Sequence, residues 1–157
     1  MLPRSARREQ AALHDAGMDV EVVVLEDSAR TAQEAAQAVG VEVGAIVKSL
    51  VFRDGGGEPV LVLVSGDNRC DEALLGVTRA DADTVREVTG YAIGGVPPVG
   101  HPAPLRTVVD AQLARFATVW AAAGTPHAVF PVGFEDLVRL TSGQVTTVSS
   151  SSSPSSS

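Results

Sequence analysis

A chain of 157 residues, 45% of them apolar and 20% charged, can bury the core of one globular domain and is too short for a second catalytic domain. Its net charge of −7 argues against a protein that binds long stretches of nucleic-acid backbone, because such binding depends on many cationic contacts with phosphates. Any nucleic-acid partner should therefore be contacted locally, and DNA is not an expected partner.

The cysteine content and the hydropathy argue against a disulfide-stabilised, metal-binding or membrane-spanning protein. The single cysteine, Cys70, cannot form an internal disulfide, and the chain has no Cys-x-x-Cys metal pattern. The apolar runs are far shorter than the ~20 residues that a membrane helix needs. We therefore expect a soluble cytoplasmic protein with no membrane partner, no metal and no cofactor.

The first predicted elements are two helices that flank a strand. Residues 5–16 have the pattern of a short amphipathic helix, and the β-branched run 20–25 predicts a strand. A helix over 31–39 has better-defined ends. Thr31 and Glu34 have the spacing of a capping box, and a glycine follows the last predicted turn.

A hairpin comes next in the chain. Two apolar runs, 45–52 and 59–64, are separated by Asp-Gly-Gly-Gly at 54–57, which is typical of a tight glycine-rich turn. Because both runs are apolar along most of their length, we expect both strands to be central in a sheet.

The remaining chain alternates single helices with strands around a loop at 90–104 that is dense in glycine and proline. This order favours an α+β fold, a single compact domain over residues 1–148 with a mixed, curled sheet flanked by helices. The serine-rich segment 149–157 predicts a disordered tail. The other predicted helices are 71–75, 81–88 and 134–140, and the other strands are 105–109, 117–120, 128–132 and 145–148.

Lys48 is the most informative single residue. It is the only lysine in a chain with twelve basic residues, and it lies in the apolar run Ala-Ile-Val-Lys-Ser-Leu-Val-Phe, where burying a cation is costly unless a partner or ligand compensates. A compact ammonium suits a tight pocket around a carbonyl or carboxylate better than a guanidinium does. Strand alternation places Ile46 and Leu50 on the face of Lys48, and Ser49 on the other face. The pattern alone leaves open a pocket lysine or a lysine on a solvated strand face.

Three segments carry a resemblance to a known family. They are the strand with Lys48, the segment Gly-Tyr-Ala-Ile-Gly-Gly-Val-Pro-Pro-Val-Gly-His at 90–101, and the turn Gly-Thr-Pro-His at 124–127. In this order they resemble the YbaK/EbsC family of aminoacyl-tRNA deacylases, which includes free-standing relatives of the prolyl-tRNA synthetase editing domain. The resemblance spans residues 22–148. It implies a curled, barrel-like sheet and a trans-editing hydrolase that acts on the ester between a wrong amino acid and tRNA.

The resemblance also implies which residues form the site. Lys48 would anchor the aminoacyl group and the terminal ribose, and the reaction would be assisted by a hydroxyl of the tRNA itself. Taken alone, the loop could equally be a rigid connector, and the histidine after the turn could be a structural hydrogen-bonding group. The role of His101 stays open. The implied substrate-binding residues are Gly94, Gly95, Val96, Pro97, Pro98, Gly100 and His127.

An aminoacyl ester is already activated, so positioning water and stabilising an oxyanion can supply much of the rate. The chain accordingly has no Gly-x-Ser-x-Gly elbow, zinc-ligand set or P-loop. The implied substrate is a small amino acid on tRNA-Pro or a related tRNA, contacted at its acceptor end, with prolyl-tRNA synthetase or an elongation factor as candidate partners. The alternatives are a non-catalytic binding module of the same fold and a small-molecule ester hydrolase.

Overall fold

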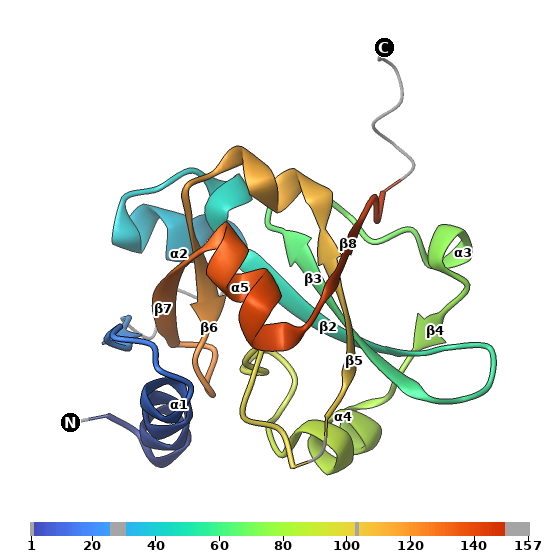
Figure 1. Cartoon of the computed structure of the whole chain (residues 1–157), viewed down its shortest axis with the longest axis horizontal. Helices are drawn as coiled ribbons and strands as arrows, with labels where there is room; N and C mark the ends of the chain where they lie inside the picture. The colour runs from blue at the N-terminus through green and yellow to red at the C-terminus, as the bar shows by residue number, and fades with distance from the viewer. Residues whose placement is uncertain (1, 26–30, 103, 150–157) are drawn as a thin grey trace.

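The computed structural model describes residues 2–25, 31–102 and 104–149, so the predicted serine-rich tail lies outside the described residues except for Ser149. The described chain forms two β-sheets with helices on the outside (Figure 1). In chain order the elements are α1 (Arg4–Asp15), β1 (Val23–Val24), α2 (Ala32–Val39), the 3-10 helix η1 (Val43–Ala45), β2 (Val47–Arg53), β3 (Pro59–Ser65), α3 (Glu72–Leu75), β4 (Thr78–Arg79), α4 (Ala82–Thr89), β5 (Arg106–Asp110), the 3-10 helix η2 (Ala111–Arg115), β6 (Thr118–Ala122), β7 (Ala128–Gly133), α5 (Phe134–Thr141) and β8 (Gln144–Thr146).

The strands belong to two open sheets. One sheet is antiparallel with the order β1-β7-β6, and the other is mixed with the order β4-β2-β3-β5-β8. A single parallel bridge between Ile46 and Trp120 links them at one end. The expected curled, barrel-like sheet is therefore wrong in that detail, because β2 and β6 are not paired beyond this bridge and neither described sheet closes on itself. The α+β class and the mixed character of the larger sheet are confirmed.

Local signals predicted the second helix well. Thr31 Oγ1 accepts a hydrogen bond from Glu34 N, and Glu34 Oε1 accepts one from Thr31 N, each at 3.1 Å. Gly40 closes the helix in the left-handed conformation with φ 76°. Each predicted helix and strand has a counterpart in the described chain, although the strand expected over 20–25 shortens to Val23–Val24.

The predicted hairpin is β2 and β3, paired in register from Val47–Ser65 to Arg53–Pro59. β3 is central, as expected, with β2 on one side and β5 on the other. β2 is different, because its other neighbour, β4, pairs with it only at Phe52 and Arg53. Most of the outer edge of β2 therefore has no neighbouring strand in the described chain.

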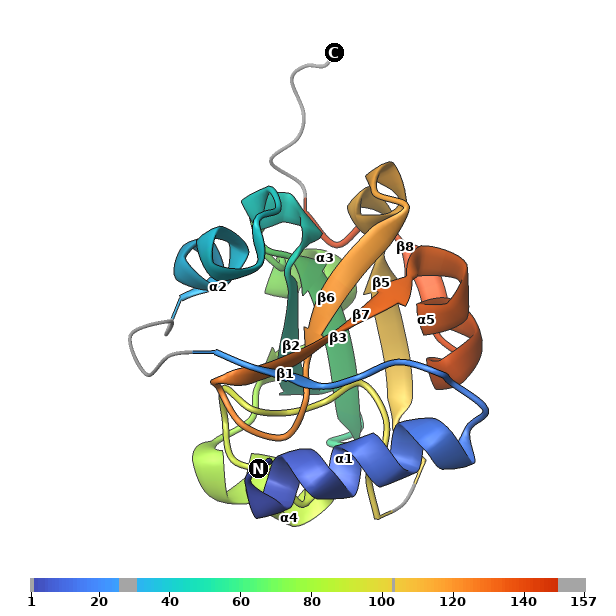
Figure 2. The ribbon, with the colours of Figure 1, turned by 90° about the vertical axis from the view of Figure 1, so that its left-hand side faces the viewer.

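The larger sheet packs on both faces. Leu61 and Leu63 of β3 point into the main core, which lies between the two sheets and receives α1 and α5. Val60, Val62 and Val64 point to the opposite face and pack with Phe52 and other residues in a second cluster. Figure 2 shows α1 beneath the ends of the sheets and α2 above them. None of the helices in the described ranges combines the length and apolarity that crossing a bilayer requires.

A buried carboxylate joins the ends of β3 and β5. Asp110 is fully buried, and its Oδ2 accepts hydrogen bonds from Ser65 N and Asn68 Nδ2, both at 3.0 Å. Its Oδ1 accepts from Gln112 N at 2.9 Å. Because β3 and β5 are parallel neighbours, their C-terminal ends meet here, and Asp110 fixes the segment that follows each strand.

Replacing Asp110 with alanine should strongly destabilise the fold. The change leaves three buried or half-buried donors without their acceptor, and we expect the free energy of unfolding to fall by about 3 kcal/mol. Asp136→Ala is the matched control, because it removes only an exposed pair with Arg139 and should cost about 0.5 kcal/mol. Equal losses for the two variants in chemical denaturation would contradict this role for Asp110.

Glu9 is a second buried carboxyl group, on the inner side of α1. Both of its carboxylate oxygens are buried without a hydrogen-bond partner among the described residues. A Cβ added at Gly100 would lie 2.6 Å from Glu9 Oε1, so the glycine leaves the space that this side chain occupies. Burial raises the pKa of Glu9 from 4.5 to about 9, with Arg8 acting in the opposite direction.

The raised pKa predicts a stability that falls with pH. The folded protein binds the Glu9 proton more tightly than the unfolded chain does, so this stability is fully present below about pH 4.5 and is lost as the pH rises toward 9. Between pH 5 and pH 8 we expect wild type to lose about 4 kcal/mol relative to Glu9→Gln, which has no such proton to lose. Parallel denaturation profiles across this range would contradict the prediction.

Candidate active site

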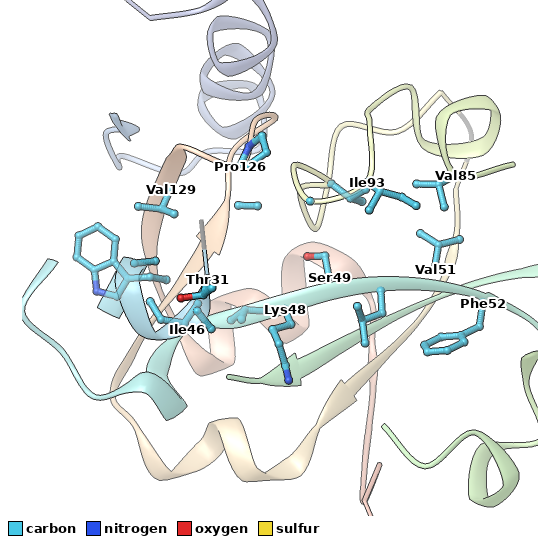
Figure 3. A pocket seen from close by; sticks show the side chains of 18 of the residues that line it. Thr31, Ile46, Lys48, Ser49, Val51, Phe52, Val85, Ile93, Pro126 and Val129 are labelled. Atoms are coloured by element: carbon cyan, nitrogen blue, oxygen red, sulfur yellow. The ribbon is translucent and has the colours of Figure 1, made fainter. Parts of the chain in front are cut away.

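A cavity of about 350 Å³ lies beside the outer edge of β2. It is bounded by the start of α2, by Trp120 and Val129 of the smaller sheet, and by Val85 of α4 with the loop that follows this helix (Figure 3). Its walls are mostly apolar. A volume of this order is typical of a site for a small ligand.

The cavity lies along a stretch of β2 that has no paired strand on its outer edge in the described chain. At one end of the gap, Ile46 forms its bridge with Trp120. At the other end, Ala80 N donates a hydrogen bond to Val51 O at 3.3 Å. Between these two points the residues of β2 line the cavity.

Lys48 extends from one face of β2 and Ser49 from the other (Figure 3). Lys48 is half-buried, and its Nζ donates a hydrogen bond to Asn68 O at 2.5 Å. The side chain of Asn68 donates a hydrogen bond to Asp110, so the carbonyl group that accepts from the Lys48 ammonium is fixed in position. An ammonium has three donors, and this bond uses one of them.

Charges around the ammonium act in opposite directions. Burial lowers the pKa of Lys48 most, and the nearby cation of Arg69 lowers it further. Asp67 and Asp110 raise it, since two carboxylates favour the charged form. Lys48 thus lies where burial and neighbouring charges compete, an arrangement found more often at functional sites than elsewhere.

The structure brings part of the predicted loop to the same cavity as Lys48. Gly94 and Val96 line it, and Ile93 lies at its wall with 57% of its surface exposed. Gly94 has φ 93°, a conformation that favours glycine. Lys48 and these loop residues therefore line one cavity.

Other predicted loop residues do not line this cavity. Gly95 packs against the 124–126 turn, where a Cβ would lie 2.7 Å from Thr125 Cα, and its carbonyl accepts from Gly124 N at 3.0 Å. His101 Nε2 donates to Pro97 O at 2.8 Å, and burial lowers the pKa of this histidine. These residues, together with Pro98 and with Gly100 beside Glu9, shape and brace the loop.

His127 is also absent from the cavity lining, whereas its neighbour Pro126 is part of it. The backbone N–H of His127 donates a hydrogen bond to Thr125 Oγ1 at 3.1 Å, which fixes the residue at the end of the turn. Its ring Nδ1 is buried without a hydrogen-bond partner among the described residues. A role for this ring in binding substrate stays a prediction.

Sequence reasoning missed Ser49 as a site residue. Its Oγ is buried and has no hydrogen-bond partner in the described chain, and the residue lines the cavity. The alternation of β2 placed Ser49 opposite Lys48, but nothing in the sequence indicates that the strand edge is open there. Within the described ranges, no group of three or more histidine, cysteine or acidic residues has the arrangement of a metal site.

Comparisons with known proteins agree with this architecture. The sequence model of the family described as "Aminoacyl-tRNA editing domain" matches residues 26–140. A crystal structure provisionally described as a trans-editing enzyme for prolyl tRNA synthetase has a TM-score of 0.90 and 50% sequence identity, and the match covers 95% of this chain and 99% of that one.

Two relatives match at lower identity. The uncharacterized protein YwhH of Bacillus subtilis is 30% identical over 131 residues, which is 80% of this chain and 83% of YwhH. EbsC of Enterococcus faecalis, provisionally named a Cys-tRNA(Pro)/Cys-tRNA(Cys) deacylase, is 25% identical over 121 residues, which is 73% of this chain and 74% of EbsC. With a family match over most of its length and a fold shared with such structures, this chain belongs to the aminoacyl-tRNA editing domain family.

Proposed function

We propose that this chain is a deacylase that hydrolyses the ester between a misplaced amino acid and the 3′ end of a tRNA. The observation that carries the proposal is the juxtaposition of Lys48 with an apolar cavity in an editing-domain fold. The cavity suits a small aminoacyl group with its ribose, and it is far too small for a folded nucleic acid.

Lys48 is proposed as the anchor of the substrate. Its ammonium is held by Asn68 O, and the donors that this bond does not use can meet oxygens of the terminal ribose or the ester. Burial and Arg69 lower the pKa of Lys48, and Asp67 and Asp110 oppose that shift. We propose that the ammonium form binds the substrate as a hydrogen-bond donor and that Lys48 does not act as a base. Gly94 and Val96 are proposed to contact the aminoacyl group from the opposite wall.

The proposed reaction is attack of water on the ester carbonyl carbon. The tetrahedral intermediate collapses by breaking the bond to the ribose oxygen, which takes a proton, and free amino acid and uncharged tRNA are released. A neighbouring hydroxyl of the tRNA is proposed to assist, as the family resemblance implies. The protein then contributes mainly position and electrostatic stabilisation.

The substrate is proposed to be a small amino acid on tRNA-Pro or a related tRNA. The names of the trans-editing structure and of EbsC support this choice. The net charge of −7 supports contact with the acceptor end alone, with prolyl-tRNA synthetase or an elongation factor as proposed partners that supply further tRNA affinity. His127, Gly95, Pro97, Pro98 and Gly100 are proposed to support the site from behind its wall.

Replacing the lysine tests the proposal. We expect Lys48→Ala to lower kcat/KM for deacylation about 100-fold or more, because the anchor for the reacting end of the substrate is lost. Lys48→Arg should also be impaired, since a planar fork cannot take the place of the ammonium on Asn68 O. Arg53→Ala is the matched control, because it removes a cation from the same strand outside the cavity.

The assay uses Cys-, Ala- and Ser-tRNA-Pro, with simple amino-acid esters alongside. Normal turnover by Lys48→Ala would contradict the anchoring role. Absence of turnover by wild type on every charged tRNA would favour a non-catalytic binding module. Equal efficiency on simple esters and charged tRNA would favour a small-molecule ester hydrolase.

A further inference from the structure

The open edge of β2 presents a specific set of backbone groups to the cavity. Val51 O accepts its hydrogen bond from Ala80 N on the outer side of β2, so the polar backbone groups of Val51 point outward. Backbone direction alternates along a strand, and Lys48 and Leu50 therefore point their N–H and C=O toward β3. Ser49 has the same orientation as Val51, and its N–H and C=O face the cavity.

These groups at Ser49 have no strand opposite them. The bridge at Ile46 and the hydrogen bond at Val51 bracket the gap, and no described strand pairs with β2 between them. The Ser49 hydroxyl is also buried without a partner among the described residues. Unpaired polar groups in an apolar wall are costly to keep unless a ligand or water satisfies them.

The pair of groups matches one kind of ligand. In an antiparallel sheet, two residues that face each other exchange two hydrogen bonds, each using one N–H and one C=O. An α-amino acid ester carries an amino donor and a carbonyl acceptor on either side of one Cα, as a residue of a strand does. The bridge at Ile46 and the hydrogen bond at Val51 limit the unpaired stretch at both ends, and Ser49 lies between them.

We propose that the aminoacyl group of the substrate binds as one extra residue on the outer edge of β2. The Ser49 carbonyl accepts a hydrogen bond from the α-ammonium, and the Ser49 N–H donates to the ester carbonyl oxygen. This inference rests on the proposed deacylase function and adds that the site reads the α-amino group through the backbone. The same N–H then faces the oxygen on which negative charge develops during attack by water.

This placement determines the direction of the substrate's amino-acid side chain and the kind of side chain that fits. A residue added to a strand directs its side chain to one face of the sheet. On the side of Ser49 that face is lined by Val51, Val85 and Val96, all buried. Short apolar or weakly polar side chains fit there, and charged side chains do not.

NMR of the labelled protein tests the backbone contacts directly. The probe is 3′-deoxy-3′-(alanylamino)adenosine, in which an amide that cannot be hydrolysed as an ester replaces the reactive bond. We expect the Ser49 amide proton to shift downfield on titration, because it gains an acceptor. The amides of Lys48 and Leu50 are the matched internal controls, since they already bond to β3 and should shift little.

Kinetics provide a second test that does not depend on the probe. We expect alanyl-tRNA to be favoured over propionyl-tRNA by about 100-fold in kcat/KM after each is corrected for its uncatalysed hydrolysis, because propionyl lacks the α-amino donor. Ser49→Pro removes the N–H and should lose about tenfold more activity than Ser49→Ala, which keeps it. Thermal unfolding of both variants shows whether the fold survives.

The possible results distinguish failure of the proposed backbone contacts from failure of the proposed deacylase function. Turnover of charged tRNA with an unmoved Ser49 amide and equal use of propionyl-tRNA would overturn the backbone contacts and leave the deacylase function standing. Absence of turnover by wild type on any charged tRNA would overturn both. A downfield Ser49 amide together with discrimination against propionyl-tRNA supports the inference even if Ser49→Pro fails to fold.

Discussion

The hydrogen bonds of the buried Asp110 carboxylate are the interaction on which the rest of the site depends. They fix Ser65 at the end of β3 and Asn68 in the following segment, and Asn68 O in turn receives Lys48 Nζ. The position of the only lysine in the chain is therefore set by a carboxylate on a different strand. Without this support, a long flexible side chain would lose rotamer freedom on binding its substrate, which costs affinity.

A second constraint is that the two sheets share only one described bridge and do not form a continuous sheet. After the bridge between Ile46 and Trp120, β2 and β6 are no longer paired, and residues of both strands line the cavity. The fold tolerates this gap because Val47 and Val51 are buried in the main core and β3 pairs with β2 along its whole length. Stability thus comes from one side of β2, and the opposite edge stays unpaired beside the cavity.

The sequence predicts what short-range chemistry determines. Helix 31–39 was predictable because its capping box and terminal glycine are local, and Lys48 stood out because no other lysine exists. The barrel-like sheet was wrong, and the pairing of β4 and the 3-10 helix η2 were not predicted, because strand pairing depends on long-range contacts and two-residue strands have no periodicity. Asp110 and Ser49 resemble ordinary strand residues in the sequence. Their importance follows from which strand ends meet and which strand edge stays open.

The central claim is that the cavity beside β2 is where the aminoacyl end of tRNA binds, with Lys48 as its anchor. A crystal structure of the protein with the non-hydrolysable alanylamino-adenosine tests it most directly. We expect the aminoacyl group in the cavity between β2 and Gly94, with Lys48 Nζ within hydrogen-bonding distance of the ribose or the carbonyl oxygen. Density for the ligand outside this cavity, or in it with Lys48 turned away and still bound only to Asn68 O, would rule out this binding mode.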